Sequence, residues 1–453
     1  MINQGQVQRF DVEIYKNDTK IYSKYELVKL WDIAKMKAWW TPKRWNDDFW
    51  NNWTINWLKS WELKDSINII EIWEKITEKW LSKSSATLFN KWTLLIAMYW
   101  ATAWDVWILW IDSSTNQAVC SIIPKIEVNK NYLFWVLLLL RKKIKSETFG
   151  WAQPNISKDY LDNLEIPLPP LKIQNKIVEI MESALKIKKQ KEEESKELFD
   201  SINNFVLWEL WIEYEEINDD MISYTHTKKL NEFNRFDPYY FQDKFNTYEW
   251  LIEKTNAVEL SECTDFLNTW NTPAKSMYTE EKEEDGINII KSWSNNWNNL
   301  INLNKVDFIK WWYNWTYAKQ NDIYILASAH QAEYVWKKIY LLSDELKEDT
   351  FFVGELLCIR ANTEVCNPYY LFSLLDTDLF KLLINRQKRG QTSHIYAKDI
   401  KKIKIPLPSL EIQEKIAIEV KVRIEKANIL KVEAKEVYES AKKKVEEMIL
   451  RDI

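Results

Sequence analysis

The chain has 453 residues, and its 62 basic against 67 acidic side chains give a net charge of −5 at pH 7. This length predicts two to four domains, and the mild acidity excludes a protein that is basic throughout. Any face that binds nucleic acid must therefore be local. The four cysteines lack CxxC spacing and the three histidines lie far apart, so we expect no metal, no cofactor and no disulfide framework.

The start of the chain and its apolar runs bear on location. Residues 1–20 are polar and do not resemble a signal peptide. The most apolar run, 132–140, is too short to span a bilayer. We therefore expect a cytoplasmic protein with no membrane partner.

In chain order, the pattern predicts a polar arm, a globular segment, a long helix, a linker, a second globular segment and a second long helix. The first globular segment, from about residue 25 to 166, shows an α+β pattern with several short apolar runs. Its expected strands are 67–70, 93–97 and 119–123, and its expected helix is 131–143. The first long helix is expected at 171–209, the linker at 213–229 and the second globular segment at 231–405.

One stretch occurs twice. The sequence at 166–177 returns at 405–416 with only three substitutions. Its Pro-x-Pro cannot continue a helix, so it ends a domain in an extended segment before a long helix begins. Each helix could run about 38 residues, or roughly 57 Å. We expect the two to pair as an antiparallel coiled coil; two independent surface helices are the alternative.

Apolar residues at heptad spacing define the expected seam between these helices. Lys191 interrupts the first seam, and Lys444 occupies the one polar position of the second. The predicted helix-pairing residues are Ile173, Ile177, Ile180, Ala184, Ile187, Ala427, Leu430, Ala434, Val437 and Ala441.

The two globular segments also echo each other weakly. Residues 55–61 match 287–293, residues 40–42 loosely match 270–273, and Val106–Trp107 matches Val335–Trp336. Two divergent copies of one frame suggest two readers of different targets, held apart by the helices.

The composition contains one anomaly: 27 tryptophans and 5 glycines. Average usage predicts about 32 glycines in a chain of this length. Several tryptophans stand where turns favour glycine, and Trp151 falls opposite Gly390 in the repeat. We hypothesise that most of these tryptophans are glycine in the cell, through a UGA codon that the organism reads as glycine. A truly tryptophan-rich protein is the alternative.

With glycine at the suspect positions, residues 39–44 become Gly-Gly-Thr-Pro-Lys-Arg and 57–61 become Trp-Leu-Lys-Ser-Gly. Residues 150–156 become Gly-Gly-Ala-Gln-Pro-Asn-Ile. Together with Pro-Leu-Pro-Pro-Leu-x-x-Gln before a long helix, these patterns resemble the specificity subunits of type I restriction–modification systems over nearly the whole chain. The tryptophan content itself departs from the family.

The resemblance implies a non-catalytic protein with two mixed α/β target-recognition domains, each followed by a spacer helix. It places the first recognition domain at 1–166, its spacer helix at 167–212, the second domain at 213–405 and its helix at 406–453. It implies as partners a double-stranded DNA with a bipartite site, two methyltransferase subunits and restriction–motor subunits.

Base reading needs bidentate or hydrogen-bonding side chains on loops that a rigid frame holds. The strongest stretch is 385–394, which combines positive charge, a glycine, amides and hydroxyls. The candidate DNA-binding residues are Thr41, Lys43, Arg44, Lys59, Ser60, Tyr99, Thr102, Gln153, Asn155, Thr272, Lys275, Lys291, Ser292, His330, Gln331, Arg386, Lys388, Arg389, Gln391, Thr392 and Ser393.

The sequence also bears on two other possible functions. An adenine methyltransferase would need an Asn/Asp-Pro-Pro-Tyr/Phe loop, but Asn367-Pro368-Tyr369-Tyr370 reads better as a helix start with Asn as the cap. No Walker or nuclease motif is present, so no catalytic residue is predicted. A coiled-coil scaffold without a DNA role stays open as the alternative function.

Overall fold

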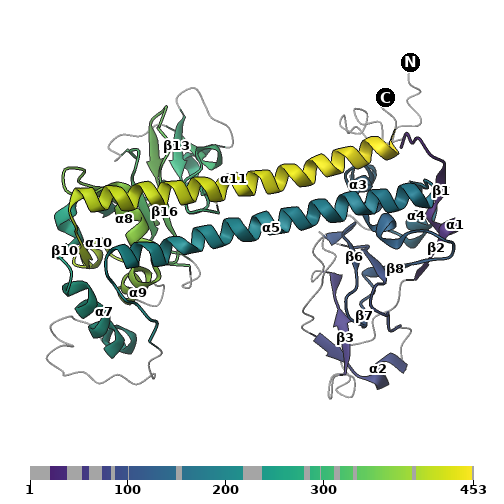
Figure 1. Ribbon diagram of the computed structural model, residues 1–453, viewed down its shortest axis with the longest axis horizontal. Helices are drawn as coiled ribbons and strands as arrows, with labels where there is room; N and C mark the ends of the chain where they lie inside the picture. Colours follow the sequence, from purple (N-terminus) through teal and green to yellow (C-terminus); the bar gives the residue numbers. More distant parts are fainter. Residues whose placement is uncertain are drawn as a thin grey trace. The chain divides into compact units, whose positions relative to one another are not determined.

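The computed structural model describes residues 21–37, 54–60, 74–82, 87–99, 102–148, 156–217, 237–279, 286–295, 297–310, 317–329, 334–389 and 394–450 (Figure 1). The chain divides into two compact units. Unit 1 comprises 1–190 and 434–453, and unit 2 comprises 191–433. Each unit combines one sheet-rich domain with part of both long helices, so the units cut across the predicted spacer segments. Within the described residues, no helix is long and apolar enough to cross a membrane.

The described residues of unit 1 form three sheets and four short or medium helices, besides their part of the two long helices. Its four-stranded sheet has the order β2-β8-β5-β6, its three-stranded sheet β4-β3-β7, and its two-stranded sheet β1-β9. The strands are β1 (Leu27–Lys29), β2 (Ala34–Lys37), β3 (Ile55–Leu58), β4 (Glu74–Ile76), β5 (Leu94–Ala97), β6 (Val106–Ile108), β7 (Ser113–Thr115), β8 (Val119–Pro124) and β9 (Glu165–Pro167). The helices are α1 (Leu30–Ile33), α2 (Glu78–Ser82), α3 (Lys130–Thr148) and α4 (Lys158–Asn163).

Unit 2 repeats this plan, with one more described strand in one of its sheets. Their orders are β11-β18-β15-β16, β12-β14-β13-β17 and β10-β19. The strands are β10 (Ala257–Glu259), β11 (Thr264–Thr269), β12 (Tyr278–Thr279), β13 (Ile287–Ile290), β14 (Asp307–Ile309), β15 (Ile323–Leu326), β16 (Ile339–Leu341), β17 (Thr350–Phe352), β18 (Leu356–Ala361) and β19 (Lys404–Pro406). The helical segments are η4 (Pro238–Phe241), α7 (Asp243–Glu253), η5 (Leu260–Cys263), η6 (Lys275–Met277), η7 (Leu303–Lys305), α8 (Pro368–Leu375), α9 (Asp378–Arg386) and α10 (Ala397–Ile400).

The expected elements of the first globular segment are confirmed where they can be seen. Strands β5 and β8 and helix α3 occupy the predicted places, while the strand expected at 67–70 lies outside the described residues. Asn367 caps α8 as predicted, because its side-chain oxygen accepts hydrogen bonds from the backbone N–H groups of Tyr369 and Tyr370.

Strand register confirms one internal match and corrects another. β3 and β13 are equivalent, since each pairs in parallel with one strand (β7 or β17) and antiparallel with another (β4 or β14). Val106, however, pairs with Ile96, and the same place in unit 2 is filled by Ile339, which pairs with Ile325. The match of Val106 with Val335 was therefore wrong. It failed because the connection between β15 and β16 (327–338) is four residues longer than that between β5 and β6 (98–105), which shifts the two sequences relative to each other.

The Pro-x-Pro junction is built alike in both units. The hydroxyl of Tyr132 donates to the Pro167 carbonyl at 2.6 Å, and that of Tyr370 donates to Pro406 at 2.7 Å. Gln174 donates to the Pro169 carbonyl, and the buried Gln413 donates to Pro408 and Val365. These bonds join the end of each sheet-rich domain to the first turn of the helix that follows.

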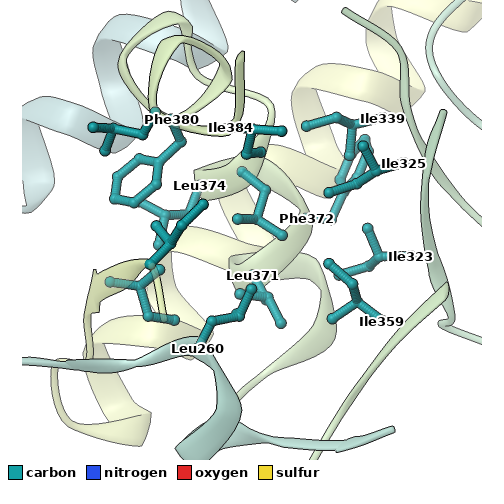
Figure 2. Packing of buried hydrophobic residues seen from close by; sticks show 14 of the residues in the cluster. Leu260, Ile323, Ile325, Ile339, Ile359, Leu371, Phe372, Leu374, Phe380 and Ile384 are labelled. Carbon is teal, nitrogen blue, oxygen red and sulfur yellow. The ribbon is translucent and has the colours of Figure 1, made fainter. Parts of the chain in front are cut away.

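The core of unit 2 joins the sheet to the helices. Isoleucines of β15, β16 and β18 face Leu371, Phe372 and Leu374 of α8 and Phe380 and Ile384 of α9 (Figure 2). The same apolar cluster continues into residues of both long helices within unit 2, namely Ile202, Val206, Ile416, Val420 and Ile424. The domain and its part of the helix pair therefore share one core, so burial of apolar surface holds them together.

The long helices are α5 (Leu171–Glu209, 39 residues) and α11 (Leu410–Ile449, 40 residues). Within unit 2 they are antiparallel (Figure 1): as the residue number increases along α5, the residue number of its contact on α11 decreases. The pairs are Lys191–Glu433, Ser195–Ala427, Ser201–Arg423 and Glu209–Lys415. In unit 1, Ile177, Met181 and Ala184 share a core with Ala441, Val445 and Ile449. The predicted antiparallel pairing is confirmed within each unit.

Part of the predicted seam has the wrong phase. Ile187 is 42% exposed, whereas Met181 is buried and the Lys188 ammonium lies 5.0 Å from the Tyr438 ring centroid. On α11, Val445 is buried and Lys444 is exposed, the reverse of the prediction. Of the remaining predicted residues, Ile177, Ala184, Ala427, Ala434 and Ala441 are buried, and Ile173, Ile180, Leu430 and Val437 are half-buried.

Candidate nucleic-acid interface

In both units a lysine follows the parallel strand and is paired internally. Lys59 follows β3 and forms an ion pair with Glu74 of β4, and Lys291 follows β13 and forms one with Asp307 of β14. The neighbouring Ser60 is buried. These lysines occupy equivalent positions, and the charge of each is partly neutralised by a carboxylate of the neighbouring strand.

Lys291 has further support from aromatic rings. Its ammonium lies 3.9 Å from the Tyr278 ring centroid, within the range of a cation–π contact. The carbonyl of the adjacent Ser292 accepts a hydrogen bond from the Tyr340 hydroxyl at 3.0 Å. Both predicted residues are held in a fixed position in unit 2.

The turn between β5 and β6 holds two predicted readers in unit 1. The Thr102 hydroxyl donates to the Tyr99 carbonyl at 3.2 Å, and the Tyr99 ring packs half-buried on the core. The Ile156 N–H donates to the Met98 carbonyl at 2.7 Å, which fixes the residue after Asn155 beside this turn. Thr41, Lys43, Arg44, Gln153 and Asn155 lie outside the described residues.

Thr272 and Lys275 lie exposed in the stretch that follows β11. Gly354 packs directly against the backbone of this stretch. A Cβ atom at position 354 would lie 2.2 Å from the Trp270 carbonyl oxygen and 3.0 Å from the Thr272 hydroxyl. The stretch can therefore occupy its place only because residue 354 has no side chain.

The predicted loop at 385–394 begins inside a helix, because α9 extends to Arg386. Arg386 is buried: its Nε donates to the Tyr240 carbonyl at 2.8 Å, and its guanidinium pairs with Glu249 at 2.5 Å. These contacts assign Arg386 to packing and favour that role over the DNA contact predicted for it.

Arg389 and His394 close the loop. Each donates its backbone N–H to the carbonyl of the other at 2.9 Å. Arg389 also pairs with Asp399 at 2.7 Å. His394 also forms an isolated antiparallel β-bridge with Ser328, and the Ile395 N–H donates to the Ala327 carbonyl at 2.9 Å. Gln391, Thr392 and Ser393 between these anchors, and His330 and Gln331, lie outside the described residues.

One lysine that the sequence did not single out, Lys337, lies near Lys388 of this loop, because both contact the Trp336 ring. Lys337 and Lys338 are exposed on the β15–β16 turn. The ammonium groups of Lys337 and Lys388 each lie 5.9 Å from the Trp336 ring centroid. Burial, followed by the charge of Lys337, lowers the pKa of Lys388 from its ordinary value. Gathering like charges is unfavourable in the free protein, and an anion such as a DNA phosphate would relieve that repulsion.

A hollow of about 370 Å³ adjoins the same loop. It is lined by Asp237, Tyr239, Asn385, Lys388 and Arg389. Both hydrogen-bond donors and hydrogen-bond acceptors can thus contact a ligand in this hollow. Among the residues that the structure describes, no group of His, Cys, Asp or Glu could hold a metal ion.

Two copies of one mixed α/β domain, each continuous with a part of an antiparallel helix pair, define a class of proteins with a duplicated domain and two long helices. Residues 22–197 and 252–437 match the family model of the type I restriction modification DNA specificity domain. The two matches cover more than half of the chain, which therefore belongs to this family. Specificity subunits are the non-catalytic recognition components of type I restriction–modification enzymes, in agreement with the absence of a predicted catalytic residue.

Individual relatives agree with the family model. The chain is 25% identical over 363 residues to the type I restriction enzyme MjaVIII specificity subunit of Methanocaldococcus jannaschii, covering 76% of this chain and 78% of that one. It is 28% identical over 178 residues to the MjaIX specificity subunit of the same organism, or 38% of this chain and 41% of that one. A solved structure concerning assembly and conformational transition of the type I R-M system matches with a TM-score of 0.55 at 14% identity, covering 95% and 97% of the two chains. At that identity the likeness shows the fold.

Proposed function

We propose that this chain reads a bipartite double-stranded DNA target, one half with each recognition domain, within a type I restriction–modification complex. The observation that carries the proposal is the duplication of a rigid frame whose exposed side chains differ between the copies. Equivalent strand pairings and equivalent junction bonds would hold loops in the same places, while different residues on those loops would read different bases.

In the proposed complex, two methyltransferase subunits and restriction–motor subunits dock on this chain, and the complex works on DNA in the cytoplasm. In unit 2, Lys337 and Lys388 would contact phosphate, and the residues between Arg389 and His394 would reach base edges. Arg389 and Asp399 then act as positioning residues, since their ion pair and the adjoining backbone bonds set where that loop begins and ends.

Modified-base sequencing of the native genome, with and without this gene, tests the proposal. We expect methyladenine in a split motif that disappears when the gene is removed. If no methylation depends on the gene, binding to DNA should be measured with the methyltransferase subunits added. Salt-dependent binding would still support a DNA role, whereas assembly with those subunits without DNA binding would favour the scaffold alternative.

The helix pair is proposed to set the gap between the two half-sites. Removing one heptad from each helix at matched positions, 188–194 with 430–436, preserves the antiparallel register given by Lys191–Glu433 and Ser195–Ala427. Seven residues correspond to about 10 Å of helix, or roughly 3 bp of DNA. The methylated motif should keep its half-sites and lose about that much spacer; an unchanged spacer would contradict the proposal.

A further inference from the structure

Left-handed backbone in this chain is concentrated at tryptophan. Within the described part of the chain, the non-glycine residues with positive φ are Trp92 (74°), Trp104 (74°), Trp211 (57°), Trp336 (73°), Asn299 (59°) and Asn321 (69°). Asparagine tolerates this region, but a bulky side chain there is a true outlier. Composition alone cannot tell which tryptophans are anomalous, and the backbone can.

The turn before β5 shows that the conformation belongs to the position and not to the residue. Trp92 donates its backbone N–H to the Leu109 carbonyl. In unit 2 the equivalent Asn321, before β15, donates to the Leu342 carbonyl at 2.7 Å. Both residues are left-handed. One copy of the turn therefore uses a residue suited to this conformation, and the other has tryptophan in its place.

A second turn carries tryptophan in both units. The Trp104 N–H donates to the Ala97 carbonyl at 2.9 Å, and the Trp336 N–H donates to the Leu326 carbonyl at 3.0 Å. Ala97 and Leu326 end the equivalent strands β5 and β15. The indole of Trp104 is buried, yet its Nε1 has no hydrogen-bond partner. The same left-handed turn thus recurs between β5 and β6 and between β15 and β16.

The fourth position ends helix α5. The Ile212 N–H donates to the Leu207 carbonyl at 2.9 Å, and the Trp211 N–H donates to the Trp208 carbonyl at 3.0 Å. These two bonds form a Schellman motif, in which the left-handed residue is usually glycine. Trp211 is 91% exposed, so its indole has almost no packing to offset the unfavourable backbone.

We infer that positions 92, 104, 211 and 336 are glycine in the functional protein. Each needs a backbone that glycine adopts freely, and each is explained if a codon read as tryptophan in this sequence is translated as glycine in the cell. At position 336 the change also bears on the candidate interface. Without the indole, Lys337 and Lys388 would share an open space beside the loop that Arg389 and His394 close.

Peptide mass spectrometry of the protein purified from its own cells tests the chemical identity directly. We expect glycine at all four positions. Tryptophan at any of them would overturn the inference for that position, whatever the outcome of the DNA-binding experiments.

Thermal unfolding of the purified chain tests the physical reason. Trp211→Gly and Trp211→Ala both remove the exposed indole, but only glycine relieves the left-handed backbone. Trp211→Gly should melt roughly 2–4 °C above Trp211→Ala. The matched control is Trp208, which is 69% exposed and lies inside α5, so glycine there should melt below alanine. Equal melting of the two position-211 variants would overturn the inference.

Discussion

The two recognition domains differ least where they meet their helices and most where their loops are exposed. At the junction, Tyr132 and Tyr370 make the same hydrogen bond to a proline carbonyl. At the turn after β5, by contrast, unit 1 has Asp105, which is buried and paired with Arg141. The equivalent turn of unit 2 ends in Lys338, which is exposed. The two domains thus keep the same frame but differ in charge at this turn, as the proposal of two readers of different half-sites requires.

Removing the junction glutamines should have the largest effect on stability. Gln413 accepts from the Asn367 N–H and donates to the Pro408 and Val365 carbonyls, whereas Gln174 accepts from the Asn129 N–H and donates to Pro169. Gln413→Ala leaves more buried groups unpaired, and should lower the free energy of unfolding by about 4 kcal/mol, against about 2–3 kcal/mol for Gln174→Ala. Urea unfolding measures both, and a larger loss for Gln174→Ala would contradict this account.

Gly354→Ala should change the recognition of one half-site and leave the recognition of the other half-site intact. Its Cβ would meet the backbone at Trp270, which cannot move as a flexible side chain could. We expect a cost of about 1–3 kcal/mol in unfolding free energy, with Thr272 and Lys275 displaced.

The readout for Gly354→Ala is base preference in the methylated motif. Preference should relax in a single half-site and stay unchanged in the other. Thr272→Ala is the matched control, because it removes the side chain without moving the backbone. Relaxation of both half-sites by Gly354→Ala would show that unit 2 does not read DNA independently.

The arginines at the two ends of one short segment should separate packing from recognition. Arg386→Ala removes a buried guanidinium and should cost about 2–3 kcal/mol in unfolding free energy. Arg389→Ala should change stability by about 1 kcal/mol or less, since its ion pair with Asp399 is partly exposed. In DNA binding, relaxed preference at one base would support its positioning role, while equal weakening on all DNA would mark it as a phosphate contact.

How far the sequence predicts this structure depends on whether a feature is local. Proline punctuation placed the start of α5 at Leu171, because Pro-x-Pro cannot be helical whatever surrounds it. The seam was harder: Ile187 looked apolar enough to be buried, yet Lys188 faces Tyr438 because a long aliphatic stem can cover apolar surface.

Features that depend on distant contacts could not be read from the sequence. Arg386 looked like a loop residue, and only the packing of α9 on η4 and α7 shows that it is buried. Lys337 is a candidate for DNA contact only because the β15–β16 turn lies beside Lys388. A pair of lysines in a hairpin turn is too common to indicate DNA contact by itself. Only the position of Lys388 next to Lys337 makes the turn a candidate.

The smallest expected effect concerns the two lysines of unit 2 that lie against the Trp336 ring. Lys337→Ala and Lys388→Ala should each weaken binding alike on all sequences and reduce the slope of log affinity against log salt by about 1. Lys291→Ala is the control in the same unit, because its ammonium is already paired with Asp307 and should release fewer counterions. Neither variant should alter base preference, since phosphate contacts carry no sequence information directly. A change of preference without a change of salt slope would mean that these lysines read bases, and that the phosphate contacts of unit 2 lie elsewhere on its surface.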